Sequence, residues 1–355
     1  WWHDLLRLPR WRSNGMSIAR LMQQAAAGGV ASTPEPDFLM TVTTTTSSET
    51  FTIPCQNVGT FNCTVDWGDS STSTITAYND ADLAHTYATA GDYQIRINGT
   101  FPNINFNNVG DKLKVKSVEN LGTVGWLRLD SAFQGCLNLT SFVVGDADTS
   151  SVTDMNEMLR DCETMTTLDL TNLNTSSVTS MERMFYRCEG MTTIDVTGFD
   201  TSNCTTMSSM FFDCQTMTTV DVTGFNTSSC THMGSMFSLC VALTTVDVSG
   251  FDTSAVTNMI MFFRNCSSLT DIVGVDDFDI TSLTDVNSLF YFAFGVTLPT
   301  SRYDSLLVKW DAQSVPSNKN TTFGSSTYTG GGTAAAARAN LISTDGWTIS
   351  DGGIA

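Results

Sequence analysis

The stretch Phe199–Gly224, FDTSNCTTMSSMFFDCQTMTTVDVTG, decides the fold, because close copies of it precede and follow it along the chain. Its cysteine at position 214 belongs to a series with an unbroken spacing of 26 residues: Cys136, Cys162, Cys188, Cys214, Cys240 and Cys266. A repeat of fixed length predicts one supersecondary unit that is copied and stacked, so that each copy buries the face that its neighbour leaves open.

The first half of each unit carries apolar residues at helical spacing. In one copy these residues are Val178, Met181, Met184, Phe185 and Cys188. Such a stripe predicts an amphipathic helix in each unit. The Thr-Ser or Ser-Ser pair before it supplies hydroxyl groups that can cap the first helical turn.

The second half of each unit alternates as a strand does. In Met191–Val196, Ile194 and Val196 are expected to point inward, and Thr193 and Asp195 outward. The unit is therefore expected to be helix, turn, strand, turn. This predicts an α/β leucine-rich-repeat solenoid of about seven units. Because helices are wider than strands, the array is expected to curve with its strands on the concave side.

The two ends of the array differ from its middle, as capping units should. In the last unit an extra residue near Asp276 shifts the register, and Ala293 is expected at the cysteine position. In the C-terminal piece we expect helices at Tyr303–Ala312 and Ala334–Ile342 and a short strand at Trp347–Ile349. The expected organisation is an N-terminal attachment helix and linker (1–37), a β-sandwich (38–110), the solenoid (111–298) and a C-terminal cap (299–355).

Charge is concentrated in the repeats. The 355-residue chain has 17 Lys+Arg and 36 Asp+Glu, a formal net charge of −19. Residues 136–290 hold 20 acidic and 4 basic side chains, so −16 of that charge lies in the array. A field of this sign repels nucleic acid and anionic membranes and favours cations or basic partners. We therefore expect no nucleic-acid binding.

The cysteines of the series are expected to be buried free thiols. Equivalent residues of neighbouring coils lie about 4.8 Å apart with parallel side chains, whereas a disulfide needs converging Cβ vectors. The methionines follow the same core period, which indicates packing and not a metal or cofactor site. Cys55 and Cys63 lie outside the repeats, and the sequence leaves open whether they pair.

Residues 38–99 alternate as short strands with turn residues between them. The text Val65-Asp66-Trp67-Gly68-Asp69-Ser70, followed by His85-Thr86-Tyr87 and Ala90-Gly91-Asp92-Tyr93, resembles polycystic-kidney-disease (PKD)-type immunoglobulin-like domains. The resemblance implies a rigid, non-catalytic spacer in an extracellular or virion protein. Trp67 is expected in its core, and Gly68–Asp69 in a turn.

The repeats resemble the BspA-like leucine-rich repeats of bacterial and phage surface proteins. The match is clearest at 174–198 (NTSSVTSMERMFYRCEGMTTIDVTG) and 252–270 (DTSAVTNMIMFFRNCSSLT). This resemblance implies adhesion or recognition with varied ligands and no shared active site. Ser17–Gly29 is similar to N-termini of marine phage virion proteins, which implies attachment to a particle.

The solvent side of the strands offers the candidate binding site. Its members are Thr167, Asp169, Thr193, Asp195, Thr219, Asp221, Thr245 and Asp247. Like charges on neighbouring strands repel, so a repeated aspartate predicts a cation or a basic partner, or else a face that keeps the protein soluble and blocks edge association. Ice binding is disfavoured because ionised aspartates interrupt the threonines.

Calcium is the one cofactor that the sequence leaves open, either at that ladder or at a cluster in the β-domain, since clustered carboxylates suit a hard cation. The cluster comprises Asp66, Asp69, Asp80 and Asp82. The spacings of known calcium-binding loops are missing, which weakens the case for calcium. We expect no other cofactor. Glycine-rich Gly330–Gly332 lacks a following catalytic lysine and is interpreted as a flexible connection.

Enzyme signals are poor. The three histidines, His3, His85 and His232, lie far apart, and none has a neighbouring triad motif. No stretch reaches the length of a membrane span, and Ile18–Val30 is too short for a convincing signal peptide.

These observations predict a non-enzymatic recognition or adhesion protein, displayed on a virion surface or extracellularly. It would bind a protein or glycan of a cell surface through the acidic strand face. The expected setting is a phage virion appendage or decoration component, attached through the N-terminal segment. A bacterial cell-surface adhesin and a purely structural virion component without a ligand are the alternatives.

Overall fold

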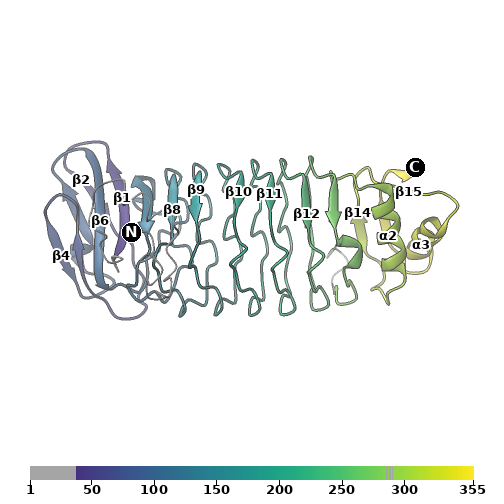
Figure 1. Ribbon diagram of the computed structural model, residues 1–355, viewed down its shortest axis with the longest axis horizontal. Coiled ribbons are helices and arrows are strands. Elements are labelled where there is room, and N and C mark those ends of the chain that lie inside the picture. Colours follow the sequence, from purple (N-terminus) through teal and green to yellow (C-terminus); the bar gives the residue numbers. More distant parts are fainter. Residues whose placement is uncertain (1–36, 285–286, 288, 290) are drawn as a thin grey trace, which may run out of the picture.

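The computed structural model describes residues 37–284, 287, 289 and 291–355. The predicted attachment helix within residues 1–36 lies outside these residues. The described chain is an elongated rod, with a β-region at one end, stacked coils in the middle and two helices at the other end (Figure 1). It is mostly sheet and turn, with few helices.

The strands are short. They are β1 (Phe38–Thr44), β2 (Glu49–Thr52), β3 (Asn62–Asp66), β4 (Thr72–Ile75), β5 (Ala84–Tyr87), β6 (Gly91–Thr100), β7 (Val115–Asn120), β8 (Ser141–Val143), β9 (Thr167–Asp169), β10 (Thr193–Ile194), β11 (Thr219–Val220), β12 (Thr245–Asp247), β13 (Asp271–Val273), β14 (Asn320–Thr322), β15 (Thr327–Tyr328), β16 (Thr348–Ser350) and β17 (Gly353–Ile354). The helices are α2 (Thr300–Asp311), α3 (Thr333–Ser343) and the 3-10 turns η1 (Ala81–Leu83), η2 (Lys112–Lys114) and η3 (Val275–Asp277).

The N-terminal β-region consists of antiparallel strands, as the alternation predicted. β1 pairs with β6, β6 with β3 and β3 with β4, while β2 pairs with β5 in a separate small sheet. Trp67 is fully buried, which confirms its predicted place in the core. Gly68 turns the chain at a φ of 81°, and a side chain there would meet the carbonyl of Gln94. The assignment of this region to the PKD type stays a prediction.

One strand joins the β-region to the repeats. β7 pairs antiparallel with β1 on one side and parallel with β8 on the other, so a single seven-stranded sheet, in the order β4-β3-β6-β1-β7-β8-β9, crosses the expected boundary at residue 110. Beneath it the Trp126 ring packs against Phe38 and Phe101, with centroids 5.5 and 5.9 Å apart, and all three rings are buried. The two regions therefore share both a sheet and a core.

The strand side of the coils matches the sequence pattern. Ile194 and Val196 are 2% and 1% exposed, whereas Thr193 and Asp195 face solvent. β10 pairs parallel with β11 in the register Thr193 opposite Thr219, one repeat apart. A spacing of 26 residues therefore places equivalent side chains above one another, as expected.

The predicted helices of the repeats are wrong. No α-helix occurs in the described part of residues 111–298, and the α/β assignment of the solenoid is corrected to a coil of strands and turns. From Met181 to Arg187, alternate N–H groups donate to carbonyls of the next coil, for example Arg183 to Ser208 at 3.0 Å and Arg187 to Phe212 at 2.8 Å. Of the N–H groups between them, those of Met184 and Tyr186 donate three residues back, as in Tyr186 to Arg183 at 3.2 Å, and that of Glu182 donates to the hydroxyl of Ser180.

Left-handed residues explain why no helix forms. Arg183 and Arg187 have φ of 54° and 56°, and the pattern recurs four residues apart in the neighbouring coils. A helix needs unbroken right-handed φ values and bonds between N–H and the carbonyl four residues earlier. A succession of tight turns with a four-residue period points the same methionine, phenylalanine and cysteine side chains inward, so the apolar spacing fits both structures.

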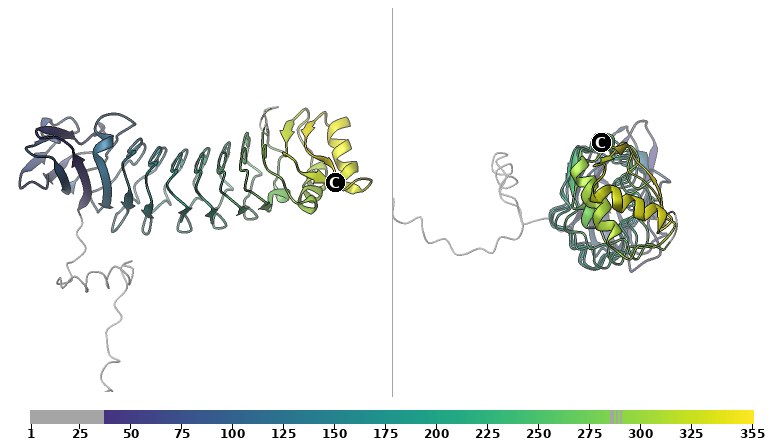
Figure 2. Two further views of the ribbon diagram at one scale, coloured as in Figure 1. Left: turned by 90° about the horizontal axis from the view of Figure 1, so that it is seen from above. Right: turned by 90° about the vertical axis from the view of Figure 1, so that its right-hand side faces the viewer.

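The expected curvature is also wrong, for the same reason. Without helices neither side of a coil is wider than the other, because inter-coil hydrogen bonds set the spacing on both sides. The coils follow one another along a nearly straight axis (Figure 2). The strand face is therefore flat and not concave.

The interior confirms the predicted thiol ladder. Each repeat cysteine is buried and free, and from Cys162 to Cys266 its Sγ donates to a carbonyl of the preceding coil, as in Cys214 to Phe185 at 3.1 Å and Cys240 to Phe211 at 3.0 Å. Burial raises the pKa of the Cys214 thiol to about 12. Cys55 and Cys63 are also free in this structure.

The threonines expected to cap helices instead tie coils together. The buried Thr175 hydroxyl donates to the carbonyl of Asp200 at 3.0 Å and accepts the N–H of Asp200 at 2.8 Å. Equivalent buried hydroxyls donate from Thr149, Thr201, Thr227 and Thr253.

The C-terminal piece closes the last coil, with α2, α3 and β16 near their predicted positions. Arg302 and Lys309 of α2 hold the buried Asp276 carboxylate at 2.8 and 2.7 Å. The register of the last coil corrects one expectation. The left-handed residue Gly295 corresponds to Asn265, so Val296 and not Ala293 takes the cysteine position, 30 residues after Cys266.

Candidate binding face and groove

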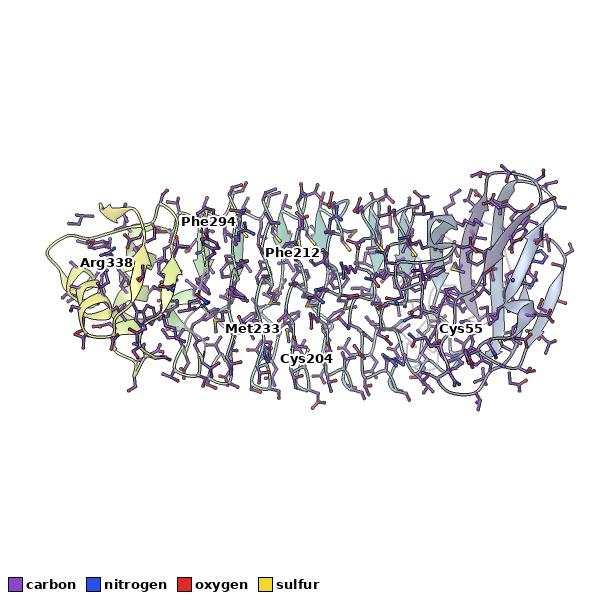
Figure 3. All side chains as sticks on the ribbon, turned by 180° about the vertical axis from the view of Figure 1, so that it is seen from behind. Cys55, Cys204, Phe212, Met233, Phe294 and Arg338 are labelled. Carbon is purple, nitrogen blue, oxygen red and sulfur yellow. The ribbon has the colours of Figure 1, made fainter. Side chains whose placement is uncertain are left out.

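The predicted ladder residues do share one face. We call the side of the array formed by the outward residues of β9–β12 the strand face. Thr167, Asp169, Thr193, Asp195, Thr219, Asp221 and Thr245 are exposed on it, and Asp247 is half-buried. Figure 3 shows the side chains projecting from the coils along the whole rod.

Each aspartate of the strand face also closes a turn. Oδ1 of Asp195 accepts the N–H and the hydroxyl of Thr197 at 3.1 and 2.7 Å, and Asp221 and Asp247 do the same with Thr223 and Ser249. The hydroxyl and N–H bonds lower the pKa of Asp221 and of Asp247. The repeated aspartate therefore also has a local structural role, closing the turn after each strand, which its charge alone does not indicate.

A second row of turn-closing residues lies at the next corner of each coil. Oδ1 of Asp200 accepts the N–H and the hydroxyl of Ser202 at 3.0 and 2.7 Å. The row consists of Asp148, Asn174, Asp200, Asn226 and Asp252. Because asparagine alternates with aspartate, this corner needs a side-chain acceptor and not a negative charge. This row could have been predicted from the sequence Asp/Asn-Thr-Ser, which recurs every 26 residues.

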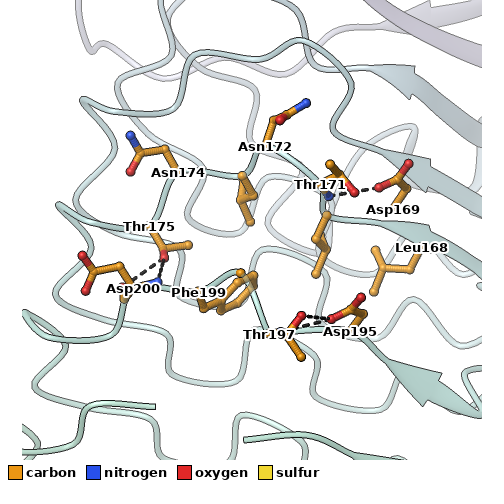
Figure 4. Close-up of a pocket in the computed structure, with 13 residues that line it drawn as sticks. Leu168, Asp169, Thr171, Asn172, Asn174, Thr175, Asp195, Thr197, Phe199 and Asp200 are labelled. Atoms are coloured by element: carbon orange, nitrogen blue, oxygen red, sulfur yellow. Dashed lines mark hydrogen bonds between the residues drawn. The ribbon is translucent and has the colours of Figure 1, made fainter. Parts of the chain in front are cut away.

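A groove opens between the coils that carry β9 and β10. We call it the inter-coil groove; it has a volume of about 500 Å³ (Figure 4). Leu168, Leu170, Leu173 and Phe199 supply its apolar surface, and Asp169, Asp195 and Asp200 supply carboxylates. Two residues of the predicted ladder, Asp169 and Asp195, thus line a cavity that sequence reasoning did not find.

Departures from the repeat text surround this groove. Leucine stands at 173, where the corresponding residues Phe225 and Phe251 stack at 6.4 Å. Leu168 and Leu170 are partly exposed, whereas Ile194 and Val196 at the same positions one coil later are buried. The sheet is interrupted both here and between β11 and β12, so the break in strand pairing does not by itself distinguish this junction.

A glycine marks the opposite corner of the same junction. At 190, glycine replaces the threonine found at 164 and 216; Thr216 donates its hydroxyl to the carbonyl of Met191 at 2.9 Å. A Cβ on Gly190 would lie 2.6 Å from the carbonyl oxygen of Met165. Glycine thus allows a close approach of the coils at this corner, while the groove separates them at the other.

Hydrogen-bond acceptors dominate the groove rim. Thr197 and Thr175 use their hydroxyl protons on Asp195 and on the Asp200 carbonyl, and Asn172 donates its amide to Gly145 at 2.9 Å. Among the described residues, no donor is recorded on Oδ2 of Asp195 or of Asp169. The side-chain donors that remain available on the rim are the Thr171 hydroxyl and the Asn174 amide.

The other candidate clusters lie apart. His85 Nε2 contacts Asp69 at 2.8 Å and Ser71 at 3.4 Å through the same ring nitrogen, so the three residues do not form a relay. Asp80 accepts the N–H groups of Thr76 and Asp82 in a separate turn. In the described part of the chain, no group of three or more His, Cys, Asp or Glu side chains is placed to hold a metal ion. His232 is exposed.

A membrane-spanning helix is absent from the residues that the structure describes. The fold and its exposed face define a repeat protein of stacked parallel coils. A family model described as "Mycoplasma protein of unknown function, DUF285" matches residues 103–218, 127–245, 190–303 and 213–329, and these matches together span well over half of the chain. The chain belongs to this DUF285 family.

Comparison with individual proteins adds one structure. It is the crystal structure of a leucine-rich cell surface protein from Faecalibacterium prausnitzii, with 16% sequence identity and a TM-score of 0.33. The likeness covers 69% of this chain and 62% of that one, so the chain spans less than two thirds of its length. No curated protein matches the chain.

Proposed function

We propose that this protein is a non-enzymatic recognition or adhesion protein, displayed at a surface, and that its strand face binds a protein or glycan. The N-terminal β-region serves as a PKD-like spacer that holds the array away from its attachment point. The single observation that carries the proposal is the strand face itself, a flat row of carboxylates over four successive strands, exposed on the first three and half-buried on the fourth, that includes the inter-coil groove.

The composition of the face supports this proposal. Carboxylates that repeat at one strand spacing repel one another, and the array carries most of the negative charge of the chain. A partner with positive groups relieves that repulsion, so the face favours association with such a partner. DUF285 membership adds the repeat architecture, and its description names no activity.

The test is adsorption of the purified protein to cells of the source habitat. Replacement of Asp195, Asp221 and Asp247 together by asparagine removes three charges, while the amide oxygen can still accept the turn hydrogen bonds. We expect adsorption to fall sharply. The matched control replaces Asp148, Asp252 and Asp279, which close turns at the other corner and do not line the groove, by asparagine. Equal adsorption of the two triple variants and the parent protein would contradict the proposed face.

A purely structural role is the second candidate, and one observation favours it. Because Oδ1 of Asp195 and its equivalents closes the turn after each strand, the aspartates have a reason to recur without any ligand. Parent-like adsorption by the strand-face variant, together with a loss of thermal stability, would support this role.

The particle that displays the protein is proposed to be a phage virion, reached through residues 1–37; this rests on the similarity of Ser17–Gly29 to virion proteins. A bacterial cell surface is the alternative. Labelling of the N-terminus and imaging of virions and cells from the source habitat separates the two, since only the true carrier shows the label.

A further inference from the structure

We propose that the inter-coil groove is a socket for one lysine or arginine side chain of a basic protein segment. This inference rests on the proposed recognition function and narrows it to one partner chemistry at one junction. It draws on the apolar lining of the groove, which is one feature, and on the carboxylates of its rim, which supply both hydrogen-bond acceptors and negative charge.

The lining suits the aliphatic part of such a side chain. Leu168 and Leu170 are partly exposed in the groove, and Leu173 and Phe199 close it from the core side. Lysine and arginine carry three or four methylene groups that lie favourably on apolar surface, while the charged end stays among polar groups. A compact metal ion would leave this leucine surface in water.

The rim suits a group that only donates. Lysine ammonium has three donors and no acceptor, and arginine guanidinium has five donors and no acceptor. The carboxylates of Asp169 and Asp195 offer acceptor oxygens beyond those used in their turns, and the hydroxyl protons of Thr175 and Thr197 are already committed. Sugar hydroxyls both donate and accept, and sugar rings usually stack their C–H faces on an open aromatic face. The one aromatic ring in the lining, Phe199, is 6% exposed.

The electrostatic setting strengthens the case for a cation. Asp169, Asp195 and Asp200 converge on the groove, and the array around it has a net charge of −16. Charge-assisted hydrogen bonds to carboxylates are about twice as strong as neutral ones. Complementary charge also steers the approach of a basic segment along the flat face.

The experiment follows the leucine methyl groups of the full chain by NMR. The probe is the peptide acetyl-Gly-Ser-Lys-Ser-Gly-amide, and the comparison peptide has norleucine, which lacks the ammonium group, in place of lysine. We expect the lysine peptide to shift the methyl signals of Leu168 and Leu170 in a saturable and salt-sensitive manner. The norleucine peptide is expected to leave them unchanged.

Three variants locate the site. Asp195→Asn keeps the turn acceptor and is expected to weaken binding about tenfold, the effect of losing one charged hydrogen bond. Leu173→Phe installs the ring of the neighbouring coils, fills the groove without changing the charge, and is expected to abolish the methyl shifts. Asp252→Asn removes the same charge from the turn-closing row, away from the groove and the strand face, and is expected to bind almost as the parent does.

Each outcome bears on the proposal. Equal weakening by Asp195→Asn and Asp252→Asn, or binding of the lysine peptide to a folded Leu173→Phe variant, overturns it in favour of diffuse attraction. A neutral glycan that shifts the same methyl groups when the lysine peptide does not also overturns it. In that case cell adsorption still depends on the strand face, so the recognition function survives. If adsorption itself is independent of the face, the proposed function fails with it.

Discussion

Two junctions between coils of almost the same sequence have different structures. Between β11 and β12, Phe225 and Phe251 stack with parallel rings, and their neighbours Val220 and Val246 are buried. Between β9 and β10, Leu173 stands in the phenylalanine position, and a groove of about 500 Å³ opens beside three carboxylates. The regular junction shows what the repeat needs in order to stack. The irregular one shows where the chain departs from that need, which is where a binding site can be sought.

The largest effect is expected from a break in the regular packing. The buried ring of Phe211 lies between Phe185 and Phe237, with centroids 5.7 and 5.6 Å apart. Phe211→Ala is expected to lower the free energy of unfolding by about 3–5 kcal/mol. Urea unfolding followed by circular dichroism measures it. Phe212→Ala, next in sequence and half-buried outside the core, is the control and should cost much less.

The next effect concerns the hydroxyls that tie coils together. Thr201→Val keeps the shape of the buried side chain, but leaves the carbonyl and N–H of Asn226 without their partner. We expect a loss of about 1–3 kcal/mol in the free energy of unfolding. Thr219→Val on the exposed strand face provides the comparison, and it should change stability little. Similar losses in both variants would mean that the hydrogen bonds of the buried threonine hydroxyls contribute no more to stability than an exposed threonine does.

Conversion of the irregular junction toward the regular one should have a smaller effect of opposite sign. Leu173→Phe adds apolar contacts across the groove, and cavity-filling changes typically stabilise by about 0.5–2 kcal/mol. Thermal unfolding of the variant and the parent protein measures the difference. A lower melting temperature would show that the β9–β10 junction is held open by more than the size of residue 173.

The smallest effect is a dependence on acidity at the turn-closing row. The hydroxyl and N–H of Ser202 lower the pKa of Asp200 in the folded chain. The unfolded chain therefore takes up the proton first, at about pH 4. The contribution of this aspartate is complete above that value and is lost as the pH falls through the lower, folded pKa.

Asparagine at the same corner cannot titrate. The difference in melting temperature between the parent protein and Asp200→Asn should therefore shrink when the pH is lowered from 7 to 3. The reverse change, Asn226→Asp, should introduce a new acid-sensitive contribution in its own coil. A difference for Asp200→Asn that is independent of pH would show that the charge of the aspartate has no part in the turn.

The sequence predicted the stacking and the orientation of the strands because both depend on period. A 26-residue spacing fixes which residues are neighbours, and alternation in Met191–Val196 fixes which of them are buried. The prediction from sequence failed for the first half of each repeat, where apolar residues spaced three and four apart fit a helix and a run of tight turns equally well. Left-handed φ values at Arg183 and Arg187 decide between them, and arginine carries no sign of that conformation.

The candidate site divides in the same way. The ladder of Asp169 and Asp195 could be read from the sequence, since outward positions of a strand are known once its register is known. The groove could not be foreseen. The chain departs from the repeat there at Leu173, at Gly190 and at Asn172, which stands where later repeats have glycine, and a single substitution within a repeat does not by itself predict a change at the junction between two coils.

The double pairing of β7 sets how the molecule points. This strand is hydrogen-bonded to β1 on one side and to β8 on the other, and the Trp126 ring is buried under it, so the rod has no hinge at that position. An anchor that holds the β-region therefore fixes the rotational orientation of every coil about the long axis of the rod. When several such molecules are anchored in the same way on one support, each presents its row of carboxylates at the same angle to its anchor.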